Sequence, residues 1–186
     1  MTGAPAGGAE KVVFEQTIEG LFVRALGPQL TPGFKQRLVA IGLDVDTRLL
    51  PAYPFDVWMK SLEIAASELY PTWPTTEAMF KVGAHLIDGY KETFLGRAVL
   101  GMIRVLGPRR MLMRATQNFR SGNNYTESRV TDVDPHTIEL WMNEVGPHPT
   151  FTAGIIHAAL AATGVTPKVV VKDHDGHACT FVCSWA

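Results

Sequence analysis

Two histidines and a cysteine near the C-terminus have the clearest capacity to bind a metal. His174 and His177 flank the Asp175-Gly176 pair, and Cys179 follows closely. Asp-Gly is the usual sequence of a two-residue hairpin turn, and facing hairpin positions place Cβ atoms about 5 Å apart. A two-histidine clamp is one interpretation. A closed zinc site needs four ligands, so the favoured alternative is a solvated hairpin tip, and we predict no metal and no cofactor.

Carboxylate pairs give little support for an enzyme. Asp132 with Asp134, and Asp44 with Asp46, are two residues apart. Each pair adjoins a turn or a helix start, where Asp side chains accept hydrogen bonds from backbone amides. The chain also lacks the nucleophile elbow, the glycine-rich phosphate loop and the His-Glu-x-x-His motif. We therefore predict a protein without enzymatic activity and name no catalytic residue.

Two histidines lie within apolar stretches that are compatible with helices, at His85 and His157. Such a histidine could be an axial haem ligand, although it more often hydrogen-bonds inside a core, and no Cys-x-x-Cys-His attachment motif is present. Cys179 and Cys183 would lie roughly 13 Å apart along one strand, too far for a disulfide. Two unpaired cysteines fit a reduced, cytoplasmic setting.

Residues 97–120 are rich in arginine and contain no acidic residue and no lysine. Arg109 and Arg110 follow Pro108 in what would be the first turn of a helix, where the helix dipole disfavours cations and free amides attract anions. An anion site is one interpretation. The favoured alternative is that the arginines form ion pairs with nearby glutamates. The arginines are Arg97, Arg104, Arg109, Arg110, Arg114 and Arg120, and the candidate partners are Glu63, Glu68 and Glu92.

Length and composition predict one domain with a substantial core. The chain has 186 residues, 46% of them hydrophobic, and a formal net charge of -1, which argues against nucleic-acid binding. Residues 1–11 read as a flexible leader with no signal-peptide pattern, and 12–186 as one α+β domain. The stretch from Pro147 to Pro167 contains no Asp, Glu, Lys or Arg, but the helix that it can form is too short to span a membrane. We therefore expect a buried helix there and no membrane span.

The longest helix-compatible segment runs from Thr75 to Gly107 and is apolar around most of its circumference. One straight helix of that length would measure about 48 Å, while a compact chain of this size has a radius of gyration of only about 16 Å. We therefore predict two packed helices with a break near Gly89. The segment contains four glycines, which indicate close approach by a neighbouring backbone or a ligand, or a kink. They are Gly83, Gly89, Gly96 and Gly101.

The remaining elements follow from periodicity and turn signals. N-terminal helices come first, and after Asn124 the spacing changes to the alternation of strands. The fold class is α+β, with N-terminal helices packed on a small four-stranded antiparallel sheet of β-β-α-β-β order. The expected helices are 17–26, 32–42, 54–70, 108–119 and 151–163, and the expected strands are 125–133, 136–145, 167–175 and 177–185.

Several phrases of the sequence resemble a myxobacterial paralogous family of domains of unknown function. The phrases are VFEQTIEGLFVRAL, IDGYKETFLGRAV, LGPRRMLMR, FRSGNNYTESRV and TFVCSW. The predicted architecture is also similar to vinyl-reductase-type regulatory domains, TRAPP tethering subunits and haem-nitric-oxide-binding domains. This resemblance implies a dimer that holds an apolar ligand between helices and sheet. The haem-binding relatives use a Tyr-x-Ser-x-Arg motif, whereas Tyr125 to Arg129 here read YTESR, with Ser128 adjacent to Arg129.

We therefore predict a non-enzymatic regulatory or sensory module that binds a small apolar or amphipathic molecule and forms a homodimer. A protein-interaction adaptor with a filled core is the alternative, and a pocket smaller than the roughly 300 Å³ of typical ligand sites would favour it. A haem-based sensor or an enzyme comes third. The pocket is expected between the central helices and the sheet. Its predicted ligand-binding residues are Trp58, Tyr90, Phe94 and Met102, with Arg110 and Tyr125 as polar anchors.

Overall fold

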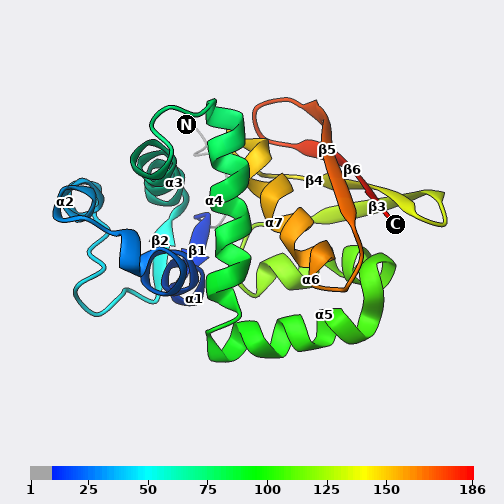
Figure 1. Cartoon of the computed structure of the whole chain (residues 1–186), viewed down its shortest axis with the longest axis horizontal. Helices are drawn as coiled ribbons and strands as arrows, with labels where there is room; N and C mark the ends of the chain where they lie inside the picture. The colour runs from blue at the N-terminus through cyan, green and yellow to red at the C-terminus, as the bar shows by residue number, and fades with distance from the viewer. Residues whose placement is uncertain (1–9) are drawn as a thin grey trace, which may run out of the picture.

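The C-terminal part of the chain forms the antiparallel sheet that alternation predicts (Figure 1). The structure is a computed structural model that describes residues 10–186. The strands lie in the order β3-β4-β6-β5, and α7 connects the two hairpins, so the predicted β-β-α-β-β order is confirmed. Their bounds are β3 Ser128–Asp134, β4 Thr137–Met142, α7 Pro149–Ala161, β5 Pro167–His174 and β6 Cys179–Trp185.

One face of the sheet is buried because its two inner strands alternate strictly. Ile138, Leu140 and Met142 of β4 point inward, and so do Cys179, Phe181 and Cys183 of β6. This face packs with α7 in one of two hydrophobic clusters of the described core. The predicted buried helix after Phe151 is therefore confirmed, and among the described residues no helix combines the length and apolar character needed to cross a bilayer.

Helix α4 separates this sheet layer from the N-terminal elements (Figure 1). It packs against α7 on one side and against α3 and η1 on the other. The N-terminal elements surround the second hydrophobic cluster. Their bounds are β1 Val12–Phe14, α1 Glu15–Ile18, the π-helix η1 Glu19–Ala25, the 3₁₀ helix η2 Gly27–Gln29, α2 Pro32–Ala40, β2 Ala52–Pro54, α3 Phe55–Leu69, α4 Thr75–Tyr90, α5 Phe94–Met113 and α6 Ala115–Arg120.

The central segment breaks into two helices, as predicted. Helix α4 ends at Tyr90, and α5 begins after Thr93, whose side chain accepts a hydrogen bond of 2.9 Å from the Gly96 amide. The predicted helix start at Pro108 is confirmed within α5, because the backbone of Gly107 is non-helical, with φ 75° and ψ 174°, and divides α5 at that point. Helix α5 is only partly covered by its neighbours, since Phe94, Met102 and Val105 are exposed.

Three further details differ from the sequence prediction. The connector before α3 contains β2, which pairs with β1 through Val13 and Tyr53; a three-residue strand is too short for its alternation to be read. The β5-β6 turn centres on Gly176 and His177 rather than on Asp175 and Gly176, since Asp175 donates its amide to Ala178 O at 3.2 Å. Most of the predicted flexible leader, residues 1–9, lies outside the described residues.

Candidate functional site

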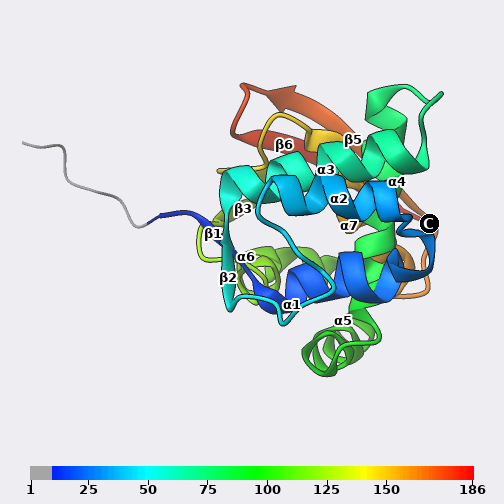
Figure 2. The same ribbon diagram turned by 90° about the vertical axis from the view of Figure 1, so that its left-hand side faces the viewer.

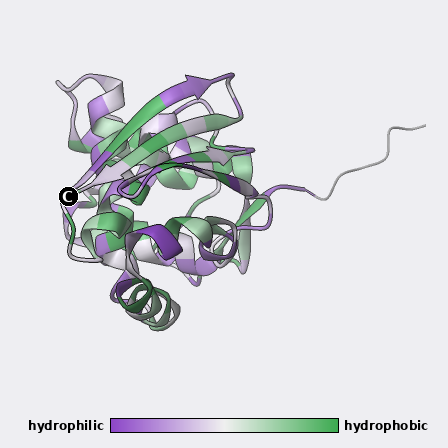
Figure 3. Cartoon of the chain, turned by 90° about the vertical axis from the view of Figure 1, so that its right-hand side faces the viewer, coloured by the Kyte–Doolittle hydropathy of each residue, from purple (hydrophilic) through white to green (hydrophobic). Residues whose placement is uncertain are grey.

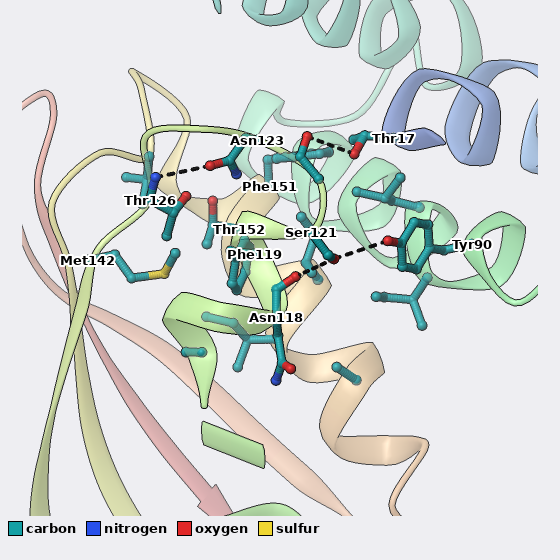
Figure 4. Close-up of a pocket in the computed structure, with 18 of the residues that line it drawn as sticks. Thr17, Tyr90, Asn118, Phe119, Ser121, Asn123, Thr126, Met142, Phe151 and Thr152 are labelled. Carbon is teal, nitrogen blue, oxygen red and sulfur yellow. Dashed lines mark hydrogen bonds between the residues drawn. The ribbon is translucent and has the colours of Figure 1, made fainter. Parts of the chain in front are cut away.

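A cavity lies between the helices and the sheet, where the two hydrophobic clusters meet (Figure 4). Its volume is about 130 Å³. The wall is largely apolar, with Trp58 and Met59 from α3, Leu86 and Tyr90 from α4, and further side chains from α5, α6, β4 and α7. The cavity is therefore built by elements that are far apart in the sequence.

The cavity is smaller than the sequence analysis required for a typical ligand site. Drug-sized pockets measure about 300 to 1,000 Å³, so the prediction of a pocket of that size is wrong. An engineered apolar cavity of about 150 Å³ nevertheless binds benzene or xenon. At about 130 Å³, this cavity has room for a molecule of a few heavy atoms and none for a lipid chain.

Three of the six predicted pocket residues line the cavity: Trp58, Tyr90 and Tyr125. Trp58 packs edge-on against Phe151, with 5.8 Å between ring centroids. Tyr90 hydrogen-bonds through its hydroxyl to Ser121 Oγ at 3.1 Å (Figure 4). Burial raises the pKa of Tyr90, and the Ser121 hydrogen bond offsets part of that rise. These three side chains therefore lie where a cavity ligand would contact them.

The other three predicted residues lie elsewhere, and their assignment to the pocket is corrected. Phe94 is 86% exposed and Met102 is 37% exposed, both on the outer side of α5. Arg110 is exposed in the same helix. Periodicity identified α5 as apolar, but it could not show which of its two apolar faces turns inward. The inward residues include Leu100 and Ile103.

Polar groups that the sequence analysis missed also border the cavity. Thr126 and Thr152 lie on one side of it, near Met142 (Figure 4). Both threonines are buried and belong to the cavity lining. A threonine hydroxyl can donate one hydrogen bond and accept others. Thr152 shares α7 with two other polar residues, Thr150 and His157, so its polarity alone did not mark it, and the position of Thr126 depends on the loop before β3.

Glu144 carries the one formal charge among the described lining residues. Its side chain is 3% exposed, forms an ion pair with Lys11 and is hydrogen-bonded to His177, whose Nδ1 lies 3.2 Å from Oε2. The Gly146 amide donates to Oε1 at 2.9 Å. Burial raises the pKa of Glu144, but the hydrogen bonds from Lys11, Gly146 and His177 outweigh it, so the pKa lies below the ordinary value.

The candidate metal ligands at the C-terminal hairpin have other partners. His174 Nε2 lies 2.9 Å from Gly146 O, while His177 pairs with Glu144. Cys179 is buried on the inner face of β6. Within residues 10–186, no group of three His, Cys, Asp or Glu side chains is arranged to hold a metal ion.

The arginines do not converge on an anion site either. Arg109 forms an ion pair with Asp132 at 2.7 Å and donates to Asp134 O. Arg97 donates to the Glu92 carbonyl oxygen at 2.9 Å. The favoured alternative of pairing is thus correct for Arg109, although its carboxylate partner comes from β3 and was not among the glutamates predicted.

The whole fold is that of haem-nitric-oxide-binding domains. An H-NOX protein from S. oneidensis, in the Fe(II)NO state, aligns with a TM-score of 0.71 and 10% identity, over 93% of this chain and 99% of that one. An Fe(II) unliganded H-NOX protein from K. algicida aligns with a TM-score of 0.60 and 8% identity, over 92% and 95%. These identities establish a shared fold only.

By sequence, the chain belongs to the family described as "Protein of unknown function (DUF2378)", which matches residues 11–186. No curated protein matches it. The predicted resemblance to a family of unknown function, and in fold to haem-nitric-oxide-binding domains, is thereby confirmed.

The residues of this chain do not fit a haem. The described cavity lining contains no histidine or cysteine to ligate iron, and no arginine or lysine to pair with propionates. His85 lies outside that lining and hydrogen-bonds through Nε2 to the Tyr70 hydroxyl at 2.8 Å. His157, also outside it, packs edge-on against Phe80.

Tyr125 and Arg129, the ends of the YTESR segment, have different surroundings in the structure. Tyr125 lies in the loop before β3 and packs against Phe55, with 5.0 Å between ring centroids. Arg129 is exposed on β3, with its guanidinium 4.6 Å from the centroid of the Trp141 ring. Tyr125 and Arg129 do not share a strand face, because β3 begins at Ser128.

Proposed function

We propose that this domain is a non-enzymatic sensory or regulatory module whose signal is a small, largely apolar molecule bound in the cavity between helices and sheet. The observation that carries the proposal is the cavity itself, a space of about 130 Å³ at the meeting point of the two hydrophobic clusters. A ligand there would contact α4, α6, α7 and β4 together. Its binding would therefore favour one packing of the two layers over another.

The polar groups at the cavity refine the class of ligand. The hydroxyls of Thr126 and Thr152 offer hydrogen bonds at one side, and the rest of the wall is mainly apolar. A compact ring or short chain with a single polar group fits this arrangement. A lipid chain or a macrocycle exceeds the volume. The amphipathic ligand predicted from sequence is thus restricted to a few heavy atoms.

The test uses benzene and phenol as probes, with thermal denaturation as the measurement. Both should raise the melting temperature, because ligands that bind the folded state stabilise it. Ala159→Leu fills the cavity from α7 and should abolish the shift, whereas Ala161→Leu, at an exposed position of the same helix, should preserve it. Thr152→Val should reduce the shift caused by phenol and leave the shift caused by benzene unchanged. Equal shifts in Ala159→Leu and the parent protein would refute the site.

A protein-interaction adaptor is the second candidate, and one observation favours it. The outer side of α5 exposes large apolar side chains, with Phe94 and Val105 86% and 87% exposed. Monomeric proteins rarely expose contiguous apolar surface without a binding role. Ligand binding and partner binding are compatible functions, since α5 both borders the cavity and carries this exposed surface.

Self-association remains a prediction, with narrower support than the sequence analysis supposed. The apolar helix after Phe151 motivated it in part, but α7 is buried between α4 and the sheet. Light scattering at micromolar concentration decides the matter. A homodimer is expected from the resemblance to dimeric domains, and a mass near 20.4 kDa would contradict it.

A further inference from the structure

Helix α5 is apolar on the side that faces away from the molecule. Figure 2 shows the helix at the edge of the fold, and in Figure 3 much of the helix has the green of hydrophobic residues. Leu100 and Ile103 on the inner side are buried, at 6% and 3% exposure. Phe94 and Val105 on the outer side are 86% and 87% exposed. The inner residues anchor the helix, so the outer ones are free to contact another molecule.

The outer residues have the spacing of a coiled-coil seam. Phe94, Ala98, Gly101 and Val105 follow one another at steps of four, three and four, which is the alternation of a and d positions in a heptad. Ala98 and Gly101 are exposed, and a Cβ at Gly101 would meet no atom within 4 Å. The two large residues thus flank a shallow notch that can receive a bulky side chain from a facing helix.

Two arginines border this seam on one side. Arg97 and Arg104 are seven residues apart, so they occupy equivalent heptad positions next to the seam, where charged residues select the partner. Both are exposed. Among the described residues, Arg97 donates to the backbone carbonyl of Glu92 and has no carboxylate partner, and Arg104 forms no ion pair. Both guanidinium groups are therefore available for carboxylates of a partner.

The charge pattern argues against a second copy of this chain as the partner. Residues 97–120 contain no Asp or Glu, so two copies of α5 packed along this seam would offer no acidic group to the arginines. An antiparallel pair would bring equivalent flanking positions together, arginine against arginine. A partner helix with acidic flanking residues meets the arginines with opposite charge.

We propose that the outer face of α5 is a docking surface for an α-helix of another protein, one with apolar residues at its a and d positions and Asp or Glu beside them. This surface is separate from the cavity, so the inference does not depend on the proposed ligand. Because Leu100 and Ile103 line the cavity while Phe94 and Val105 form the seam, α5 connects the two. Occupation of the cavity can thus alter docking.

The test measures binding of two synthetic peptides of about three heptads by fluorescence anisotropy. Both carry Leu at a and d; one has Glu at the flanking e and g positions and its twin has Lys. The acidic peptide should bind at least about fivefold more tightly. Arg97→Glu combined with Arg104→Glu should reverse that preference, and Val105→Glu should weaken the acidic peptide. Hydrogen exchange of residues 94–105 should slow when the acidic peptide is present.

Arg48→Glu is the matched control, since it reverses the charge of an exposed arginine outside α5 and should leave both affinities unchanged. Circular dichroism verifies that each variant is folded. Equal binding of the two peptides, or binding of neither, would overturn the proposal. A dimer of the protein without any peptide, if Val105→Glu dissociates it, would also overturn the proposal, because the partner would then be a second copy of this chain. If the protein sediments with phosphatidylserine vesicles, and Arg97→Glu combined with Arg104→Glu abolishes this, the surface binds lipid instead of a helix and the proposal is overturned.

Discussion

Gly83 of α4 and Gly154 of α7 are the points at which these two helices approach each other most closely. A Cβ at Gly83 would overlap the carbonyl oxygen of Phe151, and a Cβ at Gly154 would overlap that of Phe80. Each glycine thus admits the backbone of the other helix. The glycines of this segment indicated close approach by a neighbouring backbone or a ligand, or a kink, and at Gly83 the neighbour is backbone.

Replacement of either glycine should destabilise the domain strongly. We expect Gly154→Ala to lower the free energy of unfolding by about 3 kcal/mol or more, because overpacking against backbone cannot relax by side-chain rotation. Gly101→Ala is the control, at an exposed helical site with open space around it, and should stabilise by up to about 1 kcal/mol. Urea denaturation measures both. A loss below about 0.5 kcal/mol in Gly154→Ala would contradict the close crossing.

Glu144 should make stability depend on acidic pH. Its pKa in the folded protein lies below the ordinary 4.5, so the folded state favours the carboxylate more than the unfolded state does. That contribution is present above the unfolded-state pKa and is lost as pH falls through the folded-state pKa. Denaturation midpoints measured from pH 7 down to about 3 should therefore decrease.

Glu144→Gln should remove part of this dependence and cost roughly 1.5 to 3 kcal/mol at neutral pH, the scale of hydrogen bonds to a charged group. Glu139→Gln is the control. It interrupts the ion pair with Lys172, whose side chain is 48% exposed. Surface pairs contribute about 0 to 1 kcal/mol. Identical pH profiles for the two variants would show that the acid dependence originates elsewhere.

The cysteines should be unreactive in the folded protein. Burial raises the pKa of Cys179 and of Cys183 to about 12 each, and neighbouring Asp173 and Asp175 add to the rise at Cys179. The thiolate is the reactive form, so modification by a chromogenic disulfide at neutral pH should follow the rate of unfolding. Addition of urea should release two thiols per chain at once. Rapid labelling of the native protein would disprove the buried placement.

Haemin should not form a specific complex with this chain. The prediction rests on the cavity lining, which has no iron ligand of the histidine or cysteine type among the described residues. Titration with haemin should give the spectrum of the free cofactor, and His85→Ala and His157→Ala should behave like the parent protein. A stoichiometric Soret band that is lost in either His85→Ala or His157→Ala would establish a haem site. It would contradict the conclusion that the residues of this chain do not fit a haem.

The sequence alone determined the elements whose signals are local. Alternation along β4 and β6, with turn residues between strands, was enough to predict the β-β-α-β-β order, and Pro74 and the length limit on Thr75–Gly107 were enough to predict two central helices. Trp58 and Tyr90 were placed near the cavity because a large aromatic side chain in an apolar segment is usually buried, whereas Tyr125 was predicted there as a polar anchor.

Only the tertiary structure decided which way α5 faces. Its sequence is apolar on two sides, so periodicity ranks Phe94 and Val105 with Leu100 and Ile103, although the first two are exposed and the last two are buried. The inward side is selected by what α4, α6, α7 and the sheet present to it, which is long-range information. The same reason applies to Thr126, Thr152 and Glu144, because three separate segments of the chain must fold together before those side chains border one cavity.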